Sequence, residues 1–207
     1  MTQFFIVRHG ETLWNRERRI QGQGNSELSA AGLRQATAVA RHLATAGCTR
    51  LVSSDLGRTV QTAQPIAAAT GLHLETDAGL RERAFGIFEG LTADQIRARY
   101  PDDHARWQLR KPDYGIPGGE SLVQLSDRVR GALEALARAS SGKVIIVTHG
   151  GVLDALYRIA ANAALDAPRT WQLLNASVNQ IEVERDKWQL GAWGDITHLP
   201  AAEDDFG

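Results

Sequence analysis

Two histidines, each followed directly by glycine, are the first residues that could do chemistry. His9 lies in RHG after the apolar run FFIV, and His149 lies in THGG after the apolar run VIIV. An unprotonated imidazole can act as a nucleophile or a base, and Gly10 and Gly150 would let a ligand approach the backbone amides. Either histidine alone is more often an ordinary strand-end residue, but the pair together indicates a site.

Two arginines near these positions could supply positive charge. Arg8 directly precedes His9, and Arg58 lies in SDLGRT, where a helix is expected to begin and its N-terminus would favour an anion. Guanidinium groups suit phosphate well, and each charged hydrogen bond contributes about 1.5–3 kcal/mol. A carboxylate would fit almost as well, so these residues predict an anion site without choosing the anion.

Glu82, in LRERAFGIFEG, is the candidate general acid. Its local sequence alone favours a salt bridge to a nearby arginine. Beside a bound phosphate dianion, however, the pKa of a carboxylic acid rises, and the acid can then protonate a leaving alkoxide. The competing acids are Glu11, Asp55 and Glu89.

The composition excludes several classes of protein. The 207 residues include 23 Lys and Arg against 24 Asp and Glu, so no overall charge would attract nucleic acid or an anionic membrane. A single cysteine, Cys48, excludes an internal disulfide framework, and no Cys and His cluster has zinc-site spacing. Without a signal segment or a long apolar run, we expect a soluble, cytoplasmic protein with no metal and no cofactor.

The elements that must position these side chains alternate between strands and helices. Residues 4–7 and 143–148 are short apolar runs typical of strands buried in a parallel sheet, and residues 51–52 and 72–76 are further strand candidates. Helices are expected over residues 29–47, 57–70, 121–142 and 151–163, and a hairpin around residues 185–186. In the first helix, Leu33, Ala36, Ala40 and Leu43 should share the buried face. This pattern predicts an α/β fold, whose ligands bind beyond the carboxyl ends of the strands.

The segment 83–120 departs from this alternation. It mixes short helical stretches with prolines and glycines, so we expect a lid within a single domain spanning residues 1–207. Its basic residues are expected to be solvated: Arg97, Arg99, Arg106, Arg110 and Lys111. Some of its aromatic residues, with Trp14, could form a wall for the substrate, although core packing is the expectation for most: Phe85, Phe88, Trp107 and Tyr114.

Six blocks in order resemble the histidine phosphatase superfamily, also called the phosphoglycerate mutase-like family: RHGETLWN, IQGQG, SDLGRT, LRERAFGIFEG, PGGES and VTHGG. The resemblance implies a three-layer α/β/α sandwich around a mostly parallel sheet. It also implies that His9 is the phosphorylated nucleophile, that Glu82 is the proton donor, and that three residues bind the phosphoryl oxygens: Arg8, Arg58 and His149. The remaining matches imply substrate-binding positions: Gly10, Asn15, Gln21, Gly22, Arg83 and Gly150.

Three functions follow from this resemblance. We predict a metal-independent phosphatase that hydrolyses small phosphorylated metabolites through a phosphohistidine. A cofactor-dependent phosphoglycerate mutase is the alternative, although the lid segment is short and lacks the adjacent arginine pair of those enzymes. A catalytically weak phosphate-binding module is the third. We expect a small phosphorylated metabolite as the binding partner, and we expect binding to neither nucleic acid nor a membrane. The C-terminal hairpin has an open strand edge that could pair with a second copy of the chain to form a homodimer.

Overall fold

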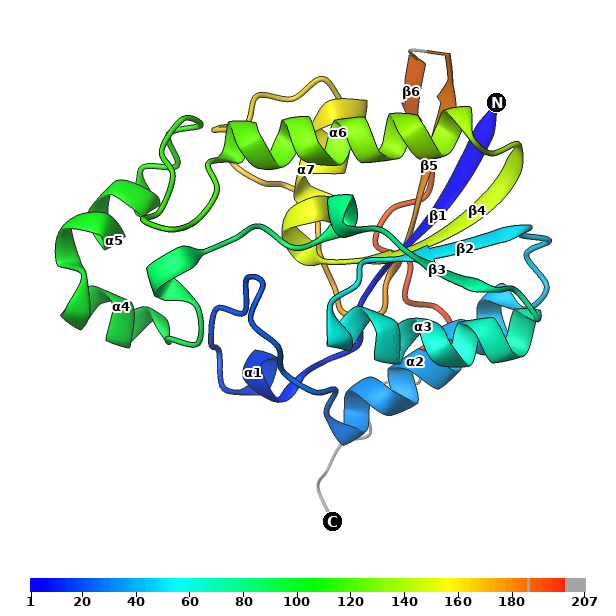
Figure 1. Ribbon diagram of the computed structural model, residues 1–207, viewed down its shortest axis with the longest axis horizontal. Coiled ribbons are helices and arrows are strands. Elements are labelled where there is room, and N and C mark those ends of the chain that lie inside the picture. The colour runs from blue at the N-terminus through cyan, green and yellow to red at the C-terminus, as the bar shows by residue number, and fades with distance from the viewer. Residues whose placement is uncertain (186, 200–207) are drawn as a thin grey trace.

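The computed structural model describes residues 1–185 and 187–199, and its centre is a six-stranded sheet of order β3-β2-β4-β1-β5-β6 (Figure 1). The strands are β1 (Thr2–Arg8), β2 (Arg50–Ser53), β3 (Leu74–Thr76), β4 (Gly142–Thr148), β5 (Val178–Glu184) and β6 (Lys187–Leu190). β1 to β4 run parallel, and β5 is antiparallel to both β1 and β6. The predicted mostly parallel sheet with a hairpin at one side is confirmed, although Asp186 itself lies outside the described residues.

Helices cover both faces of this sheet. α2 (Ala30–Leu43) and α3 (Gly57–Thr70) pack on one face, and α6 (Leu122–Arg138) and α7 (Gly150–Ala160) pack on the other (Figure 1). Side chains alternate along β1, so Phe4 and Ile6 enter the core beneath α6 and α7, while Phe5 and Val7 enter the core beneath α2 and α3. The three-layer α/β/α architecture is therefore confirmed.

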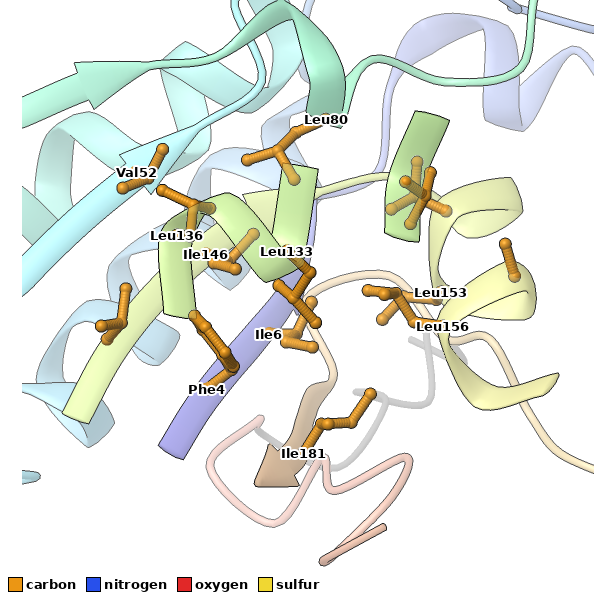
Figure 2. Close-up of a cluster of buried hydrophobic side chains, with 14 of the residues drawn as sticks. Phe4, Ile6, Val52, Leu80, Leu133, Leu136, Ile146, Leu153, Leu156 and Ile181 are labelled. Carbon is orange, nitrogen blue, oxygen red and sulfur yellow. The ribbon is translucent and has the colours of Figure 1, made fainter. Parts of the chain in front are cut away.

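The core beneath α6 and α7 contains residues from far apart in the sequence. Figure 2 shows Ile6 of β1 beside Leu133 of α6, with Phe4 on one side and Leu153 and Leu156 of α7 on the other. All five side chains are fully buried. Burying apolar surface contributes about 25 cal/mol per Å², so this packing fixes both helices against the strand that carries the first histidine.

Several predicted helix boundaries are confirmed and others are corrected. α3 spans the predicted residues 57–70 and ends at Gly71, whose φ of 71° is the left-handed conformation that favours glycine. Ser29 caps α2 as predicted, but α2 ends at Leu43, before Gly47, and Leu33 is 54% exposed instead of buried. The buried face of α2 instead begins with Gly32.

Three other predicted elements are shorter than expected. α6 ends at Arg138 rather than at residue 142, and α7 ends at Ala160 rather than at residue 163. β3 begins at Leu74, two residues later than predicted. In each case the missing residues are terminal ones, where sequence patterns define boundaries least well.

The segment 83–120 forms a separate group of short helices. It contains the 3₁₀ turn η2 (Gly86–Phe88), α4 (Ala93–Arg99) and α5 (Pro101–Gln108), and α4 and α5 lie at the far left of Figure 1, away from the sheet. Phe88, Ile96 and Ile116 form a small core of their own. No helix in the described part of the chain has the length and apolar character needed to cross a membrane.

Candidate active site

The two histidines lie side by side at the carboxyl ends of two central strands. β1 and β4 are neighbouring parallel strands in which Arg8 pairs with Thr148, so both strands end at the same level and the next residues are His9 and His149. The His9 amide donates to the carbonyl oxygen of Thr148 at 2.9 Å, and the two imidazole ring centres are 5.3 Å apart. Both histidines are buried. The predicted meeting of the two strand ends is confirmed.

His9 has one ring nitrogen that is free to react. Its Nδ1 lies 2.8 Å from the carbonyl oxygen of Gly10, and because a carbonyl can only accept, Nδ1 carries the hydrogen. Nε2 therefore keeps its lone pair. Burial lowers the pKa of His9 well below its ordinary value, and the charges of Arg58 and Arg8 lower it further. The ring is neutral at pH 7, as a nucleophilic imidazole must be.

Backbone carbonyl groups fix both arginines. Arg58 is fully buried, and its guanidinium donates to the carbonyl oxygens of Gly22 at 2.7 Å and Gly24 at 2.8 Å. Arg8 donates to the carbonyl oxygen of Leu173. The Nε atom of each arginine is buried without a hydrogen-bond partner among the described residues. Burial lowers the pKa of Arg58 to about 10, so it remains cationic at neutral pH.

Glu82 is held at the N-terminus of α7. Its Oε1 accepts from the backbone amide of Arg83 at 2.8 Å, and its Oε2 accepts from that of Gly151 at 3.0 Å. A Cβ atom at position 151 would lie 2.2 Å from Oε1, so only glycine leaves room for this carboxylate. This arrangement places an acid beside the two arginines without the ion pair to a neighbouring arginine that the sequence alone favours.

The three competing acids each bind another group of the protein. Glu11 accepts from the Ser29 hydroxyl at 2.6 Å, and Asp55 is paired with Arg81. Glu89 accepts from the backbone amides of residues 23 and 85 at 3.0 and 2.9 Å. Of the four candidate acids, Glu82 is the one that lines the cavity in front of His9.

His149 completes the group from the end of β4. Its Nε2 lies 2.9 Å from the hydroxyl of Ser54, and its Nδ1 is buried without a partner among the described residues. Burial lowers the pKa of His149 well below its ordinary value, and the charge of Arg58 adds to this effect. With no anion bound, this ring is also neutral.

A cavity of about 210 Å³ opens in front of His9. Three of the predicted substrate-binding residues lie in its wall, namely Asn15, Gln21 and Gly22, together with the aromatic side chains of Phe85 and Trp107 from the segment 83–120. The other predicted aromatic residues do not line it: Phe88 is in the small core, Tyr114 donates to Asp103, and Trp14 packs beside Gly24 and Gly90. The expectation that most of these aromatic residues pack in a core or on a neighbour fits these positions.

The remaining predicted residues have other positions. Arg83 and Gly150 line an adjoining cavity of about 370 Å³, which shares Arg8 with the first. Gly10 does not line the cavity in front of His9; a Cβ atom there would lie 2.6 Å from the carbonyl oxygen of Gly32. Glycine is therefore required at position 10 for close contact with α2.

Two supporting residues carried no role in the sequence analysis. The Asn175 side chain donates to the carbonyl oxygen of His9 at 2.9 Å, and Ser54 contacts His149 as described above. Ser54 is the first residue of SDLGRT, so that block contained a signal for it, whereas no local pattern marks Asn175. No group of three or more His, Cys, Asp or Glu with metal-ligand geometry occurs in residues 1–185 and 187–199.

Comparisons with known proteins agree with this geometry. A sequence model described as histidine phosphatase superfamily (branch 1) matches residues 4–196. A probable phosphoglycerate mutase GpmB from Salmonella newport is 38% identical over 211 residues, covering 97% of this chain and 96% of that protein.

Solved structures agree as well. YhfR from Bacillus stearothermophilus matches with a TM-score of 0.88 and 30% identity, covering 97% of this chain and all of that one. A mycobacterial glucosyl-3-phosphoglycerate phosphatase in complex with VO3 matches with a TM-score of 0.82 and 33% identity, covering 93% and 98%. A putative alpha-ribazole-5'-P phosphatase from Escherichia coli shares the fold at 20% identity, with a TM-score of 0.87 and coverage of 94% and 96%.

Proposed function

This chain belongs to the histidine phosphatase superfamily, and from that premise we propose that it is a metal-independent phosphatase that hydrolyses small phosphomonoesters through a phosphohistidine on His9. The proposal is based mainly on one observation. The neutral imidazole of His9 keeps an unpaired Nε2 beside the buried Arg58 and the half-buried Arg8. Such a ring can attack phosphorus, and the arginines can stabilise the charge on the phosphoryl oxygens.

In the first step, the lone pair of His9 Nε2 forms a bond to phosphorus and the ester P–O bond breaks. Arg8, Arg58 and His149 stabilise the charge on the three phosphoryl oxygens. The departing alkoxide takes a proton from the Glu82 carboxyl group.

In the second step, the Glu82 carboxylate takes a proton from water. The water oxygen attacks phosphorus, the N–P bond breaks, and its electron pair returns to Nε2. Inorganic phosphate then leaves, and the carboxyl group is again protonated. Neither step requires a metal, because guanidinium and imidazole groups perform the charge stabilisation.

A mutase is the second candidate, favoured by the relative named as a probable phosphoglycerate mutase at 38% identity. The phosphohistidine would be the same, and a hydroxyl group would accept the phosphoryl group in place of water. A mutase must keep water away from the intermediate. Incubation with a phosphoglycerate separates the two functions, since a phosphatase releases inorganic phosphate and a mutase yields the isomer.

The test of the proposed function is hydrolysis of p-nitrophenyl phosphate in excess EDTA by wild type and His9→Ala. The expected result is turnover by wild type and none by His9→Ala. His73→Ala is the matched control and should retain full activity, because His73 is exposed and lies at the amino end of β3, opposite to the strand ends that carry His9 and His149. Circular dichroism establishes that each variant is folded.

Three outcomes would contradict the proposal. Substantial activity in folded His9→Ala would exclude this residue as the nucleophile. Absence of both turnover and trapped phosphohistidine in folded wild type would favour the phosphate-binding module. Loss of activity on chelation, restored by a divalent cation, would overturn the metal-independent mechanism.

A further inference from the structure

We propose that the ion pair between Arg128 and Glu120 positions Glu82 for proton transfer to the leaving group. This proposal rests on the proposed phosphatase function and names two positioning residues for it. Neither residue has a role so far, because Glu120 entered only as part of the PGGES block and Arg128 only as part of a helix.

Arg128 binds the backbone of the loop that carries Glu82. Its Nη1 donates to the carbonyl oxygens of Gly79 and Arg81, both at 2.9 Å, and its Nη2 donates to that of Glu82 at 3.3 Å. Residues 81–85 belong to no helix or strand, so no regular hydrogen-bond pattern fixes their backbone. The leucine and valine side chains of α6 are buried in the core, so the helix itself is fixed. Arg128 therefore connects an irregular loop to a rigid element.

One of these bonds orients the peptide group that binds the Glu82 carboxylate. The carbonyl group of Glu82 and the amide of Arg83 belong to the same planar, trans peptide group. Its C=O accepts from Arg128, and its N–H points the opposite way and donates to Glu82 Oε1 at 2.8 Å. The side-chain amide of Gln23 donates to the same carbonyl oxygen at 3.3 Å. Rotation of this peptide group would turn the N–H away from the carboxylate, so the bond from Arg128 helps to fix where the acid lies.

Glu120 fixes the other side of the loop. Its carboxylate accepts from Nε and Nη2 of Arg128, both at 2.7 Å. The same carboxylate accepts from the Ala84 amide at 2.9 Å, and the Glu120 amide donates to the Ala84 carbonyl oxygen at 2.9 Å. Arg128 thus binds residue 82 while Glu120 binds residue 84, and the amide of Arg83 lies between these two fixed points.

Both members of the pair are charged at neutral pH. The side chains of Arg128 and Glu120 are 23% and 20% exposed. Burial would raise the pKa of Glu120, but the hydrogen bonds from Arg128 and from the Ala84 amide outweigh that effect, so the pKa is lowered. Two N–H···O bonds between ionised partners fix direction as well as distance. A lysine would keep the charge and lose the fork that reaches several oxygens at once.

Neighbouring residues of the PGGES block pack at the same place. Gly119 lies against residue 84, since a Cβ atom on Gly119 would lie 2.5 Å from the Ala84 carbonyl oxygen. Ser121 is the N-cap of α6 and so begins the helix that carries Arg128. The block therefore joins the end of the segment 83–120 both to the loop of the acid and to α6.

A positioning role and a purely structural role predict different kinetics. Neither Arg128 nor Glu120 lines the cavity in front of His9 or the adjoining one, so the pair acts through the backbone that it holds. Loss of folded structure would lower the hydrolysis of every ester alike. Misplacement of the acid lowers mainly the hydrolysis of esters whose leaving group needs a proton.

The test compares two esters of similar shape with different leaving groups. p-Nitrobenzyl phosphate releases an alkoxide that needs a proton, and p-nitrophenyl phosphate releases a phenolate that is stable without one. For both esters kcat/KM is measured by phosphate release. Arg128→Lys should lower the ratio of kcat/KM, benzyl over phenyl ester, by about 10- to 100-fold, because a misplaced acid transfers its proton poorly. This ratio does not depend on the fraction of enzyme that is folded.

Further variants separate the pair from other charges of α6. Glu120→Gln should lower the same ratio by a smaller factor, because its amide oxygen can still accept from the Ala84 amide. Arg138 and Glu134 form another ion pair of α6, with N and O atoms 3.9 Å apart. Arg138→Lys and Glu134→Gln are therefore the matched controls, and both should leave the ratio at the wild-type value.

A double variant tests whether Arg128 acts through the acid. In Glu82→Gln, adding Arg128→Lys should cause no further fall in kcat/KM for p-nitrobenzyl phosphate relative to p-nitrophenyl phosphate, because no acid remains to be positioned. An additional fall of the size seen in the wild-type background would overturn the proposal.

The remaining outcomes separate this inference from the proposed function. A ratio unchanged in Arg128→Lys, or equal losses on both esters, would overturn the positioning role and leave the phosphatase intact. Hydrolysis of the phenyl ester alone by wild type would show that no proton reaches the leaving group, and would also overturn this role. No hydrolysis of either ester by folded wild type would overturn the phosphatase itself.

Discussion

At the scale of single residues, the carboxylate of Glu82 is bound by two backbone amides and by no guanidinium group. We expect Glu82→Gln to reduce kcat for alkyl phosphates by about 10²- to 10⁴-fold, because a poor leaving group needs the proton. Hydrolysis of p-nitrophenyl phosphate should fall far less, because its leaving group is stable without one. Parallel kinetics on the two classes of ester test this, and equal losses on both would indicate a binding role for Glu82.

The pKa of His9 leads to a prediction about pH. Because the pKa of His9 lies well below the ordinary 6.5, the ring stays neutral as the pH falls through that value. We therefore expect kcat/KM, corrected for titration of the substrate phosphate near about pH 6, to remain constant from about pH 8 to below 6.5. An acid limb centred at pH 6.5 in the corrected kcat/KM profile would contradict the lowered pKa of His9.

The sequence predicted the residues of the candidate site better than it predicted the residues that support them. His9 and His149 each follow a clear strand, so the parallel sheet alone implied that they meet. Asn175 contacts the His9 carbonyl oxygen from a segment far along the chain. It lies in no periodic pattern, and no local rule predicts such a contact.

At the scale of elements, the start of α7 determines where Glu82 lies. Gly151→Ala would place a Cβ atom 2.2 Å from Glu82 Oε1, and the flexible carboxylate should move aside while the helix remains intact. We expect kcat for alkyl phosphates to fall by at least about tenfold, with KM and the midpoint of thermal unfolding little changed. Steady-state kinetics and calorimetry measure both.

Gly131→Ala in α6 is the matched control, since nothing lies within 4 Å of a Cβ atom there. It should stabilise the fold by about 0.5–1 kcal/mol through helix propensity and leave turnover unchanged. Unchanged kcat in Gly151→Ala would show that this contact does not position the acid.

The error at Leu33 has an identifiable cause. The N-terminal turn of α2 approaches the loop after β1 so closely that a Cβ atom on Gly32 would lie 2.0 Å from the carbonyl oxygen of Glu11. That contact requires glycine on the buried face and turns Leu33 to the surface. Hydrophobic periodicity predicts burial of large side chains, and it does not detect a helix end that packs through its backbone.

At the scale of the whole molecule, the buried His9 and His149 and the half-buried His198 make stability depend on pH. Lowered pKa values at His9, His149 and His198 mean that the unfolded chain binds protons near pH 6.5 that the folded chain does not. The free energy of unfolding should therefore decrease as the pH falls through 6.5. Urea unfolding at several pH values, in phosphate-free buffer, measures this slope, and constant stability across this range would contradict it.

The overall architecture was predictable in part. Local patterns marked most strands and helices, and the family resemblance supplied the three layers. The position of each strand in the order β3-β2-β4-β1-β5-β6 depends on pairing between distant segments, which periodicity does not encode. The path of the segment 83–120 likewise depends on its own small core.

The central position of β1 affects how this chain can fold while it is being synthesised. β1 pairs on one side with β4 and on the other with β5, so Phe4 lies between Val144 and Ile181. During translation, the first strand leaves the ribosome long before either neighbour exists. The nascent chain therefore carries an apolar strand with both edges open, and this strand gains its second neighbour only after β5 has been synthesised.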